Sequence, residues 1–188
     1  MKIDSERIAE VLIAILKARD DYTAEHSRRV AEYSVAIAER MGLGEEEVRK
    51  VKLAALLHDF GKIGVPDSIL RKPDKLTEDE FKVITAHPTL SADILAQIPG
   101  MDEIARIIVH HHEAWDGRGY PDGLKGEEIP IESRIIAVAE TIDILIHGSV
   151  YRSVVTLQEA LEEIKRGAGT QFDPRVVEAA AEILNDPD

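Results

Sequence analysis

The segment His58-Asp59-Phe60-Gly61-Lys62 ends an apolar run in which Leu53 and Leu57 share one face at helical spacing. The glycine in this segment predicts that the helix breaks close to the aspartate. A second segment, residues 111–121, reads His-His-Glu-Ala-Trp-Asp-Gly-Arg-Gly-Tyr-Pro. Together the two segments supply imidazoles, carboxylates and one lysine to a helical protein. This combination favours metal-assisted attack of water on phosphorus.

Apolar residues recur at helical spacing along nearly the whole chain, and no stretch shows sustained strand alternation. We therefore predict an all-α fold, a bundle of about eight or nine helices. The predicted helices span residues 4–19, 23–41, 45–58, 89–97, 101–113 and 131–146, and others begin at the capping boxes of Thr77 and Thr156 and at Asp173-Pro174. Residues 114–130, rich in Gly, Pro and Asp, form the longest predicted loop, and loops of this length are usually functional.

The composition limits the classes of function. A length of 188 residues suits one domain, here 1–188 with the motifs inside 20–178. The chain has no cysteine, so any metal must be bound by histidine and carboxylate. A net charge of −13 disfavours long nucleic acids and anionic membranes, although metals and Lys62 would attract a small anionic substrate. No signal peptide or bilayer-spanning run is visible, so we expect a cytoplasmic protein.

Several polar side chains fall on the buried faces of different predicted helices. His26 shares a face with Val30, His111 follows Ile107 by four residues, and Glu140 lies on the apolar face of its own helix. Burying such groups unpaired would cost a few kcal/mol each, whereas a shared metal satisfies them together. A mixed nitrogen and oxygen ligand set suits Mn, Fe or Zn better than Ca.

A single inward histidine is more often a hydrogen-bonded core residue than a metal ligand. We keep that simpler interpretation for His110, which would need a different helix face, and for His147, which we expect to be exposed. The remaining histidines all fall at motif positions, a pattern that independent core histidines would not produce. For these residues the metal-site interpretation is preferred.

At this point the motifs resemble those of the HD-GYP family, within the HD superfamily of metal-dependent phosphohydrolases. The similar segments are residues 20–30, 58–67, 72–73, 76–80, 87–88, 111–113, 116–121, 123–124, 129–130, 134–139 and 169–174. The resemblance implies an all-helical HD-type domain whose long loop lies at a centre of two or three metals, typically iron or manganese. It also implies a phosphodiesterase that opens cyclic di-GMP to pGpG, sometimes continuing to GMP, by attack of a hydroxide shared between two metals.

The resemblance assigns roles to individual side chains. The implied metal ligands are His26, His58, Asp59, His87, His111, His112 and Glu140. Asp59 would bridge two metals and Lys62 would hold a phosphate oxygen, which makes both of them catalytic. Gly119-Tyr120-Pro121 would border the substrate together with Arg152. We expect two divalent ions, Fe or Mn in the cell, with Zn, Ni or Mg as alternatives in a purified sample.

This chain departs from the family pattern at four places. Glu140 stands where the family usually has Asp. Tyr22 stands where some members with a third metal carry a carboxylate, so we expect two metals. The residues after Asp143 differ from the usual segment, which helps to grip guanine nucleotides, and only Tyr151-Arg152 is retained. Ser91 replaces the usual glycine.

Two alternatives remain open. The altered residues 144–150 are compatible with an HD phosphohydrolase acting on another cyclic dinucleotide or on a nucleoside phosphate. The chain could also be a non-catalytic module that binds a nucleotide or a partner protein through the retained fold. Under every interpretation the possible protein partners are a second copy of the chain, in a homodimer, or a separate regulatory protein. We expect control to come from a separate partner, unless the chain is a fragment of a longer protein.

Overall fold

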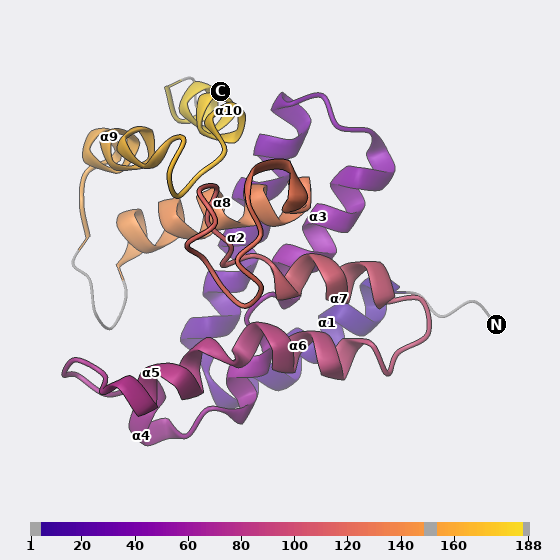
Figure 1. The fold of residues 1–188 in the computed structure, drawn as a ribbon. Helices are drawn as coiled ribbons and strands as arrows, with labels where there is room; N and C mark the ends of the chain where they lie inside the picture. The colour runs from indigo at the N-terminus through magenta and orange to yellow at the C-terminus, as the bar shows by residue number, and fades with distance from the viewer. Residues whose placement is uncertain (1–4, 149–153, 186–188) are drawn as a thin grey trace.

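The computed structural model describes residues 5–148 and 154–185, and these ranges fold into helices joined by loops (Figure 1). The elements are α1 (Ser5–Arg19), α2 (Asp21–Arg40), α3 (Glu45–Leu57), η1 (Phe60–Gly64), α4 (Asp67–Leu70), α5 (Glu78–Thr85), α6 (His87–Leu95), α7 (Asp102–Val109), η2 (Gly126–Glu128), α8 (Ile131–His147), α9 (Leu157–Gly167) and α10 (Pro174–Asn185). The described ranges contain no β-strand, and one isolated bridge joins Ala168 to Phe172. The all-α prediction is confirmed.

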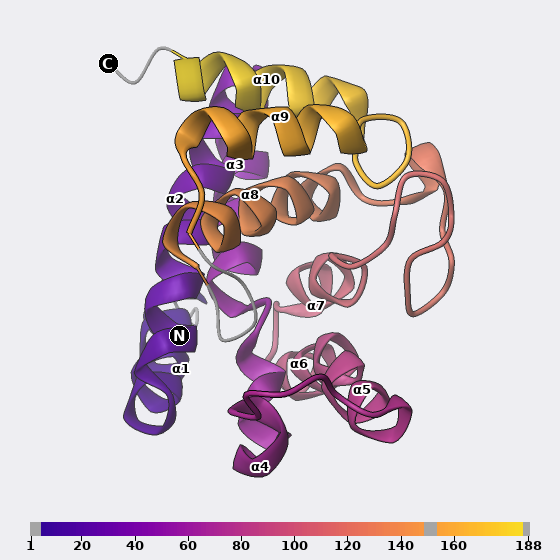
Figure 2. The same cartoon turned by 90° about the vertical axis from the view of Figure 1, so that its left-hand side faces the viewer.

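Helices α2, α3 and α8 pack against one another at the centre of the fold. Their contact faces are apolar, with Val30, Ile37, Leu57, Ile136 and Ile142 fully buried. Helices α9 and α10 cover one side of α8 and α7 lies on the other (Figure 2). Because it is covered on both sides, α8 is apolar around most of its circumference. No helix in the described ranges has both the length and the apolar character needed to cross a membrane.

The two predicted capping boxes fix the starts of α5 and α9. The Thr77 hydroxyl accepts the backbone N–H of Glu80 at 3.3 Å, and the Thr77 N–H donates to the Glu80 carboxylate at 2.8 Å. Thr156 and Glu159 make the same reciprocal pair. Each box satisfies backbone donors that a helix start leaves unpaired. Short polar signals in the sequence therefore locate these two helix starts.

The chain leaves α7 earlier than predicted. A helix over 101–113 was expected, but α7 ends at Val109 and residues 110–113 form tight turns. In these turns the N–H of His111 bonds to the Ile108 carbonyl and that of Glu113 to the His110 carbonyl. Residues 110–113 contain neither glycine nor proline, so no local signal marks the end of this helix.

The long loop after α7 is held by backbone bonds to a distant turn. The N–H of Trp115 donates to the Gln171 carbonyl at 3.1 Å, and that of Asp116 to the Thr170 carbonyl at 2.8 Å. The loop therefore lies against the turn between α9 and α10, at the right of the view in Figure 2. This attachment fixes the position of residues 111–121 relative to α8.

Candidate metal centre

Three buried histidines present the same ring nitrogen to a common centre. In His58, His87 and His111, Nδ1 bonds to the backbone carbonyl three residues earlier, at 2.7, 2.6 and 2.6 Å. A carbonyl oxygen can only accept a hydrogen bond, so Nδ1 carries the proton and Nε2 keeps a lone pair. This is the tautomer that a metal-ligating histidine adopts when its other nitrogen is fixed by a backbone carbonyl.

The atoms that face this centre have no hydrogen-bond partner in the described part of the chain. They are Nε2 of His58, His87 and His111 and Oδ1 of Asp59. Nε2 of His87 and Oδ1 of Asp59 lie 3.1 Å apart, although both are acceptors. Buried acceptors facing one another are unfavourable unless a cation lies between them. The arrangement therefore fits a divalent metal.

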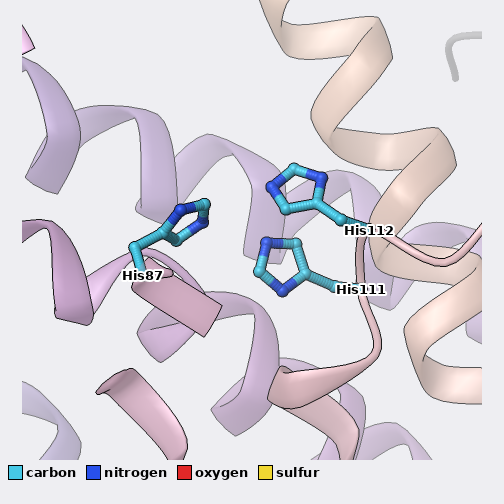
Figure 3. Close-up of side chains that lie close together, drawn as sticks. All are labelled: His87, His111 and His112. Atoms are coloured by element: carbon cyan, nitrogen blue, oxygen red, sulfur yellow. The ribbon is translucent and has the colours of Figure 1, made fainter. Parts of the chain in front are cut away.

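The side chains predicted as ligands gather into three overlapping groups, whose ligand atoms all lie within 4.8 Å of one another inside each group. The groups are His87 with His111 and His112, His26 with His58 and Glu140, and His58 with Asp59 and His111. Figure 3 shows the first group, with His87 on one side and the consecutive His111 and His112 on the other. Every predicted ligand belongs to at least one group. Because groups share His58 and His111, they describe one centre with room for more than one ion.

Asp59 lies in the middle of the centre and is fully buried. Its Oδ2 is 3.7 Å from Nε2 of His26 and 3.5 Å from Nε2 of His58, and it accepts a 2.7 Å bond from Nζ of Lys62. Burial alone would raise the pKa of Asp59, but Lys62 and the histidines outweigh burial and hold it well below its usual value. Asp59 is therefore a carboxylate available to a metal.

Lys62 carries the positive charge closest to Asp59. Burial alone would lower its pKa, but the attraction of Asp59 and Glu140 is stronger and raises the pKa above its usual value. The side chain is 19% exposed, so its ammonium group lies at the edge of the centre. Lys62 is consequently a permanent cation that can reach a bound anion.

Close packing of two small residues shapes the turn that presents Asp59. Ser91 accepts the N–H of Gly61 at 2.6 Å and donates to the His58 carbonyl at 3.0 Å. A Cβ on Gly61 would collide with the His87 carbonyl oxygen and with the backbone of Ser91. The glycine is thus required by close approach, and the unusual Ser91 satisfies two buried backbone groups of the turn.

The Gly119-Tyr120-Pro121 segment lies beside His112. The Tyr120 ring is tilted by 31° to the ring of His112, with centroids 4.9 Å apart, and the Tyr120 N–H donates to the His112 carbonyl at 3.2 Å. Burial raises the pKa of Tyr120, and the carboxylates of Glu140 and Asp59 raise it further. Tyr120 is therefore a neutral phenol next to the metal centre.

A side chain that the sequence analysis gave no separate role holds this segment in place. Glu113 is buried, and its Oε1 accepts the backbone N–H groups of Asp122 and Gly123 at 2.8 and 3.1 Å. Gly119 packs so tightly against the backbone of Glu113 and Ala114 that no larger residue fits there. In the sequence this residue was marked only as the Glu of the His-His-Glu motif, and its hydrogen bonds to Asp122 and Gly123 are seen only in the fold.

A cavity of about 380 Å³ opens beside the ligands. It is lined by His111, His112, Glu113, Ala114, Arg118, Gly119, Tyr120, Ala137, Glu140, Thr141, Ile144 and Gln171. Its walls combine an apolar side from α8 with polar groups from the loop, as small-molecule sites do. Arg118 on the rim is exposed and paired with Asp116. Arg152, predicted to contact the substrate, lies outside the described residues.

Two histidines that were set aside do not enter the ligand groups found among the described residues. Nε2 of His110 lies 3.0 Å from Oδ2 of Asp122, away from the centre. His147 is 38% exposed, and its Nδ1 lies 2.9 Å from Oδ1 of Asp143. His110 is thus paired outside the centre, and His147 is exposed as expected, with its imidazole beside the buried Asp143.

Burial in the centre favours the uncharged form of three histidines, His58, His111 and His112. Burial lowers the pKa of His58 and lowers those of His111 and His112 much further, with neighbouring imidazoles adding to the effect in the last two. Only a neutral imidazole has a lone pair for a metal. At neutral pH these three rings are therefore ready to bind a cation.

Both the sequence and the fold are similar to those of known proteins. A family model described as HD domain matches residues 10–176. The cyclic di-GMP phosphodiesterase response regulator RpfG of Xanthomonas campestris is 44% identical over 179 residues, which cover 93% of this chain and 47% of the relative. A cyclic di-GMP phosphodiesterase of Thermotoga maritima is 43% identical, with 92% and 47% covered. The chain thus spans about half the length of these curated relatives.

Other relatives have a different named substrate. The 3′3′-cGAMP-specific phosphodiesterase 3 of Vibrio cholerae is 38% identical, covering 91% of this chain and 37% of that protein. A crystal structure of a cyclic GMP-AMP-specific phosphodiesterase from V. cholerae has a TM-score of 0.74 at 23% identity, covering 95% of this chain and 49% of its own. The PgpH HD domain of L. monocytogenes in complex with cyclic-di-AMP has a TM-score of 0.68 at 20% identity, with 93% and 95% covered. These two structures share the fold.

Proposed function

We propose, from the premise that the chain belongs to the HD domain family, that it is a metal-dependent phosphodiesterase which hydrolyses cyclic di-GMP to pGpG, with GMP as a further product. The convergence of unpaired Nε2 and Oδ1 atoms on one buried centre carries this proposal. Hydrogen-bonded core histidines would not leave their acceptors facing each other. A cavity directly beside these atoms gives a substrate access to them.

The ligand set supports two divalent ions held by the histidines, Asp59 and Glu140. When bound, such ions lower the pKa of water towards 7 and neutralise charge on phosphoryl oxygens. The mixture of imidazole and carboxylate favours iron or manganese, with zinc, nickel or magnesium as alternatives in a purified sample. At the position where a third ion would need a carboxylate, Tyr22 donates its hydroxyl to the Gly148 carbonyl at 2.7 Å.

The residues of the chain supply the other steps. Lys62, at the edge of the centre, would hold a non-bridging phosphoryl oxygen and stabilise the charge that grows there. Asp59 would help to hold the ions with both of its oxygens, because they face different histidines. Gly119-Tyr120-Pro121 would border the nucleotide in the cavity. Arg152 would add a second contact to phosphate or base.

A related substrate is the second candidate. Ile144 lines the cavity and lies within the segment that departs from the usual pattern, so a nucleotide bound there would meet a different side chain at this position. The 38% identical relative named as 3′3′-cGAMP-specific shows that closely similar chains bear other substrate names. The second candidate is therefore hydrolysis of another cyclic dinucleotide or a nucleoside phosphate by the same chemistry.

The test begins with protein purified without oxygen, whose metal content is measured by elemental analysis. The loaded protein is then incubated separately with cyclic di-GMP, 3′3′-cGAMP, cyclic di-AMP and simple nucleotides, and the products are separated by chromatography. We expect about two ions per chain and fastest conversion of cyclic di-GMP to pGpG. Faster conversion of another substrate would favour the second candidate. Nucleotide binding without any product, at full metal occupancy, would favour a non-catalytic module.

A further inference from the structure

Both oxygens of a buried carboxylate next to the metal centre are in contact with neighbouring basic side chains. Asp143 is fully buried in α8. Its Oδ2 receives Nδ1 of His26 at 2.6 Å and Nη2 of Arg29 at 3.1 Å. Its Oδ1 receives Nε of Arg29 at 2.6 Å and lies 2.9 Å from Nδ1 of His147. Because its oxygens are already taken, Asp143 is unsuited to binding a metal itself.

The contact distinguishes His26 from the other buried histidines. Their Nδ1 atoms bond to neutral backbone carbonyls, whereas Nδ1 of His26 bonds to a carboxylate. The carboxylate fixes the proton on Nδ1, so the Nε2 lone pair of His26 is turned towards Asp59, 3.7 Å away. Its negative charge also makes the ring a stronger electron donor to a metal.

The same contacts join the two helices that contribute to this part of the centre. Helix α2 carries the ligand His26 and, three residues later, Arg29, while α8 carries Glu140 and, three residues later, Asp143. Each helix therefore offers one predicted ligand and one supporting group on the next turn. The His26 and Arg29 bonds to Asp143 fix the separation of His26 from Glu140.

We infer that Asp143 is the positioning residue of the metal centre, which fixes the tautomer and direction of His26 and thereby sets the affinity for one of the two ions. The inference rests on the proposed metal centre. Asp143 acts through His26 and touches neither substrate nor ion. His147, where this chain departs from its family's usual sequence, is a lesser support, because Arg29 still holds the same oxygen when His147 is removed.

The test compares the unmodified protein with Asp143→Asn and Asp143→Ala. Metal-stripped proteins are titrated with Mn²⁺ by calorimetry, and the tautomer of His26 is read in the metal-free state by ¹⁵N NMR. Asparagine keeps an acceptor oxygen but loses the charge, and alanine loses both. We therefore expect affinity at one site to fall about 10- to 100-fold, more in alanine than in asparagine, while the other site is retained. The Nδ1–H form of His26 should dominate in the unmodified protein and lose its dominance in Asp143→Ala.

Asp173 provides a matched control. It is also buried and pairs with Arg134 at 2.7 Å and Arg175 at 3.0 Å, but no described histidine contacts it. Asp173→Asn should lower thermal stability and leave Mn²⁺ affinity unchanged.

Equal Mn²⁺ affinities in the Asp143 variants and the unmodified protein would overturn the inference, as would a dominant Nε2–H form of His26 in the unmodified protein. Failure of the unmodified protein to bind any divalent metal would instead overturn the proposed function. The tautomer of His26, measured by NMR without metal, would still test the His26–Asp143 bond. If Asp143→Ala does not fold, Asp143→Asn alone decides.

Discussion

The ring of Tyr120 lies against the imidazole of His112, with centroids 4.9 Å apart and planes inclined by 31°. The contact connects the loop that borders the cavity with a predicted metal ligand. Aromatic contacts of this kind contribute about 0.5–1.5 kcal/mol beyond the area that they bury. The position of His112 is therefore coupled to the position of the loop.

Tyr120→Phe should keep this ring contact, and Tyr120→Ala should remove it. We expect kcat/KM to fall about two- to tenfold more in the alanine variant than in the phenylalanine variant, which corresponds to the energy of the contact. Steady-state kinetics with cyclic di-GMP measures the difference. Equal losses in the two variants would assign the effect to the hydroxyl group and would contradict a role for the ring.

Asp59→Ala should abolish turnover and remove most of the bound metal, because Asp59 faces histidines on both sides of the centre. Metal content per chain and product formation are measured on the same preparation. Asp173→Asn, which removes a buried carboxylate away from the centre, should retain its metal. Undiminished activity of the Asp59 variant would show that the centre is assigned to the wrong residues.

Glu140→Asp restores the shorter carboxylate that resembles the family pattern. Glu140 lies in the group with His26 and His58, and its Oε2 is 3.8 Å from Nδ1 of His112. We expect kcat to stay within about tenfold of the unmodified value, a change of roughly 1.4 kcal/mol in the barrier. A thousandfold loss would mean that this centre is built around the longer side chain.

The buried histidines predict how the stability of the metal-free protein depends on pH. Burial lowers the pKa values of His58, His111 and His112, whereas in the unfolded chain each titrates near about 6.5. Below that pH the unfolded state binds more protons, so the free energy of unfolding should fall as the pH decreases. Above about pH 7.5 all three rings are neutral in both states and contribute no pH dependence.

Urea unfolding of metal-stripped protein between about pH 5 and pH 8 measures this trend. His111→Gln removes one of the groups with a strongly lowered pKa, so its curve should be flatter below about pH 6.5. A free energy of unfolding that stays constant or rises on acidification through this range would contradict the prediction.

Ser91→Ala removes both bonds that the hydroxyl makes inside the Asp59 turn. The N–H of Gly61 and the carbonyl of His58 would lose that partner, which costs about 1–3 kcal/mol for a buried group. Ser133→Ala is the control, because Ser133 is equally buried but donates only to the Ile107 carbonyl. Thermal unfolding should show losses in both variants, and Mn²⁺ affinity should fall only in Ser91→Ala. Unchanged stability and affinity of that variant would contradict the role of the hydroxyl.

Helical periodicity was sufficient to predict the fold class and the burial of most candidate ligands. His26 and Glu140 lie on the faces predicted from their apolar neighbours, because the spacing of a helix fixes which residues share a side. His111 is buried as predicted, but it lies in the turns after α7 and not on a helix face. The capping boxes at Thr77 and Thr156 are local signals in the same sense. Helical spacing and capping boxes, which are local patterns, were therefore enough to predict these features.

Long-range partners could not be predicted in the same way. Asp143 and His26 are 117 positions apart, and no local pattern shows that they meet. No glycine or proline marks the early end of α7, so no local signal indicated that the helix ends at Val109. Glu113 and Ser91 are marked in the sequence only by their positions within motifs, and their hydrogen-bond partners are defined by the folded turns.

The backbone bonds from Trp115 and Asp116 to Gln171 and Thr170 have a mechanical consequence. They tie the rim of the cavity to the turn that joins the last two helices. A movement of this rim away from the turn would break both bonds, unless α9 and α10 moved together with the rim. A protein that binds α9 and α10 would therefore control the width of the cavity without touching the predicted metal ligands.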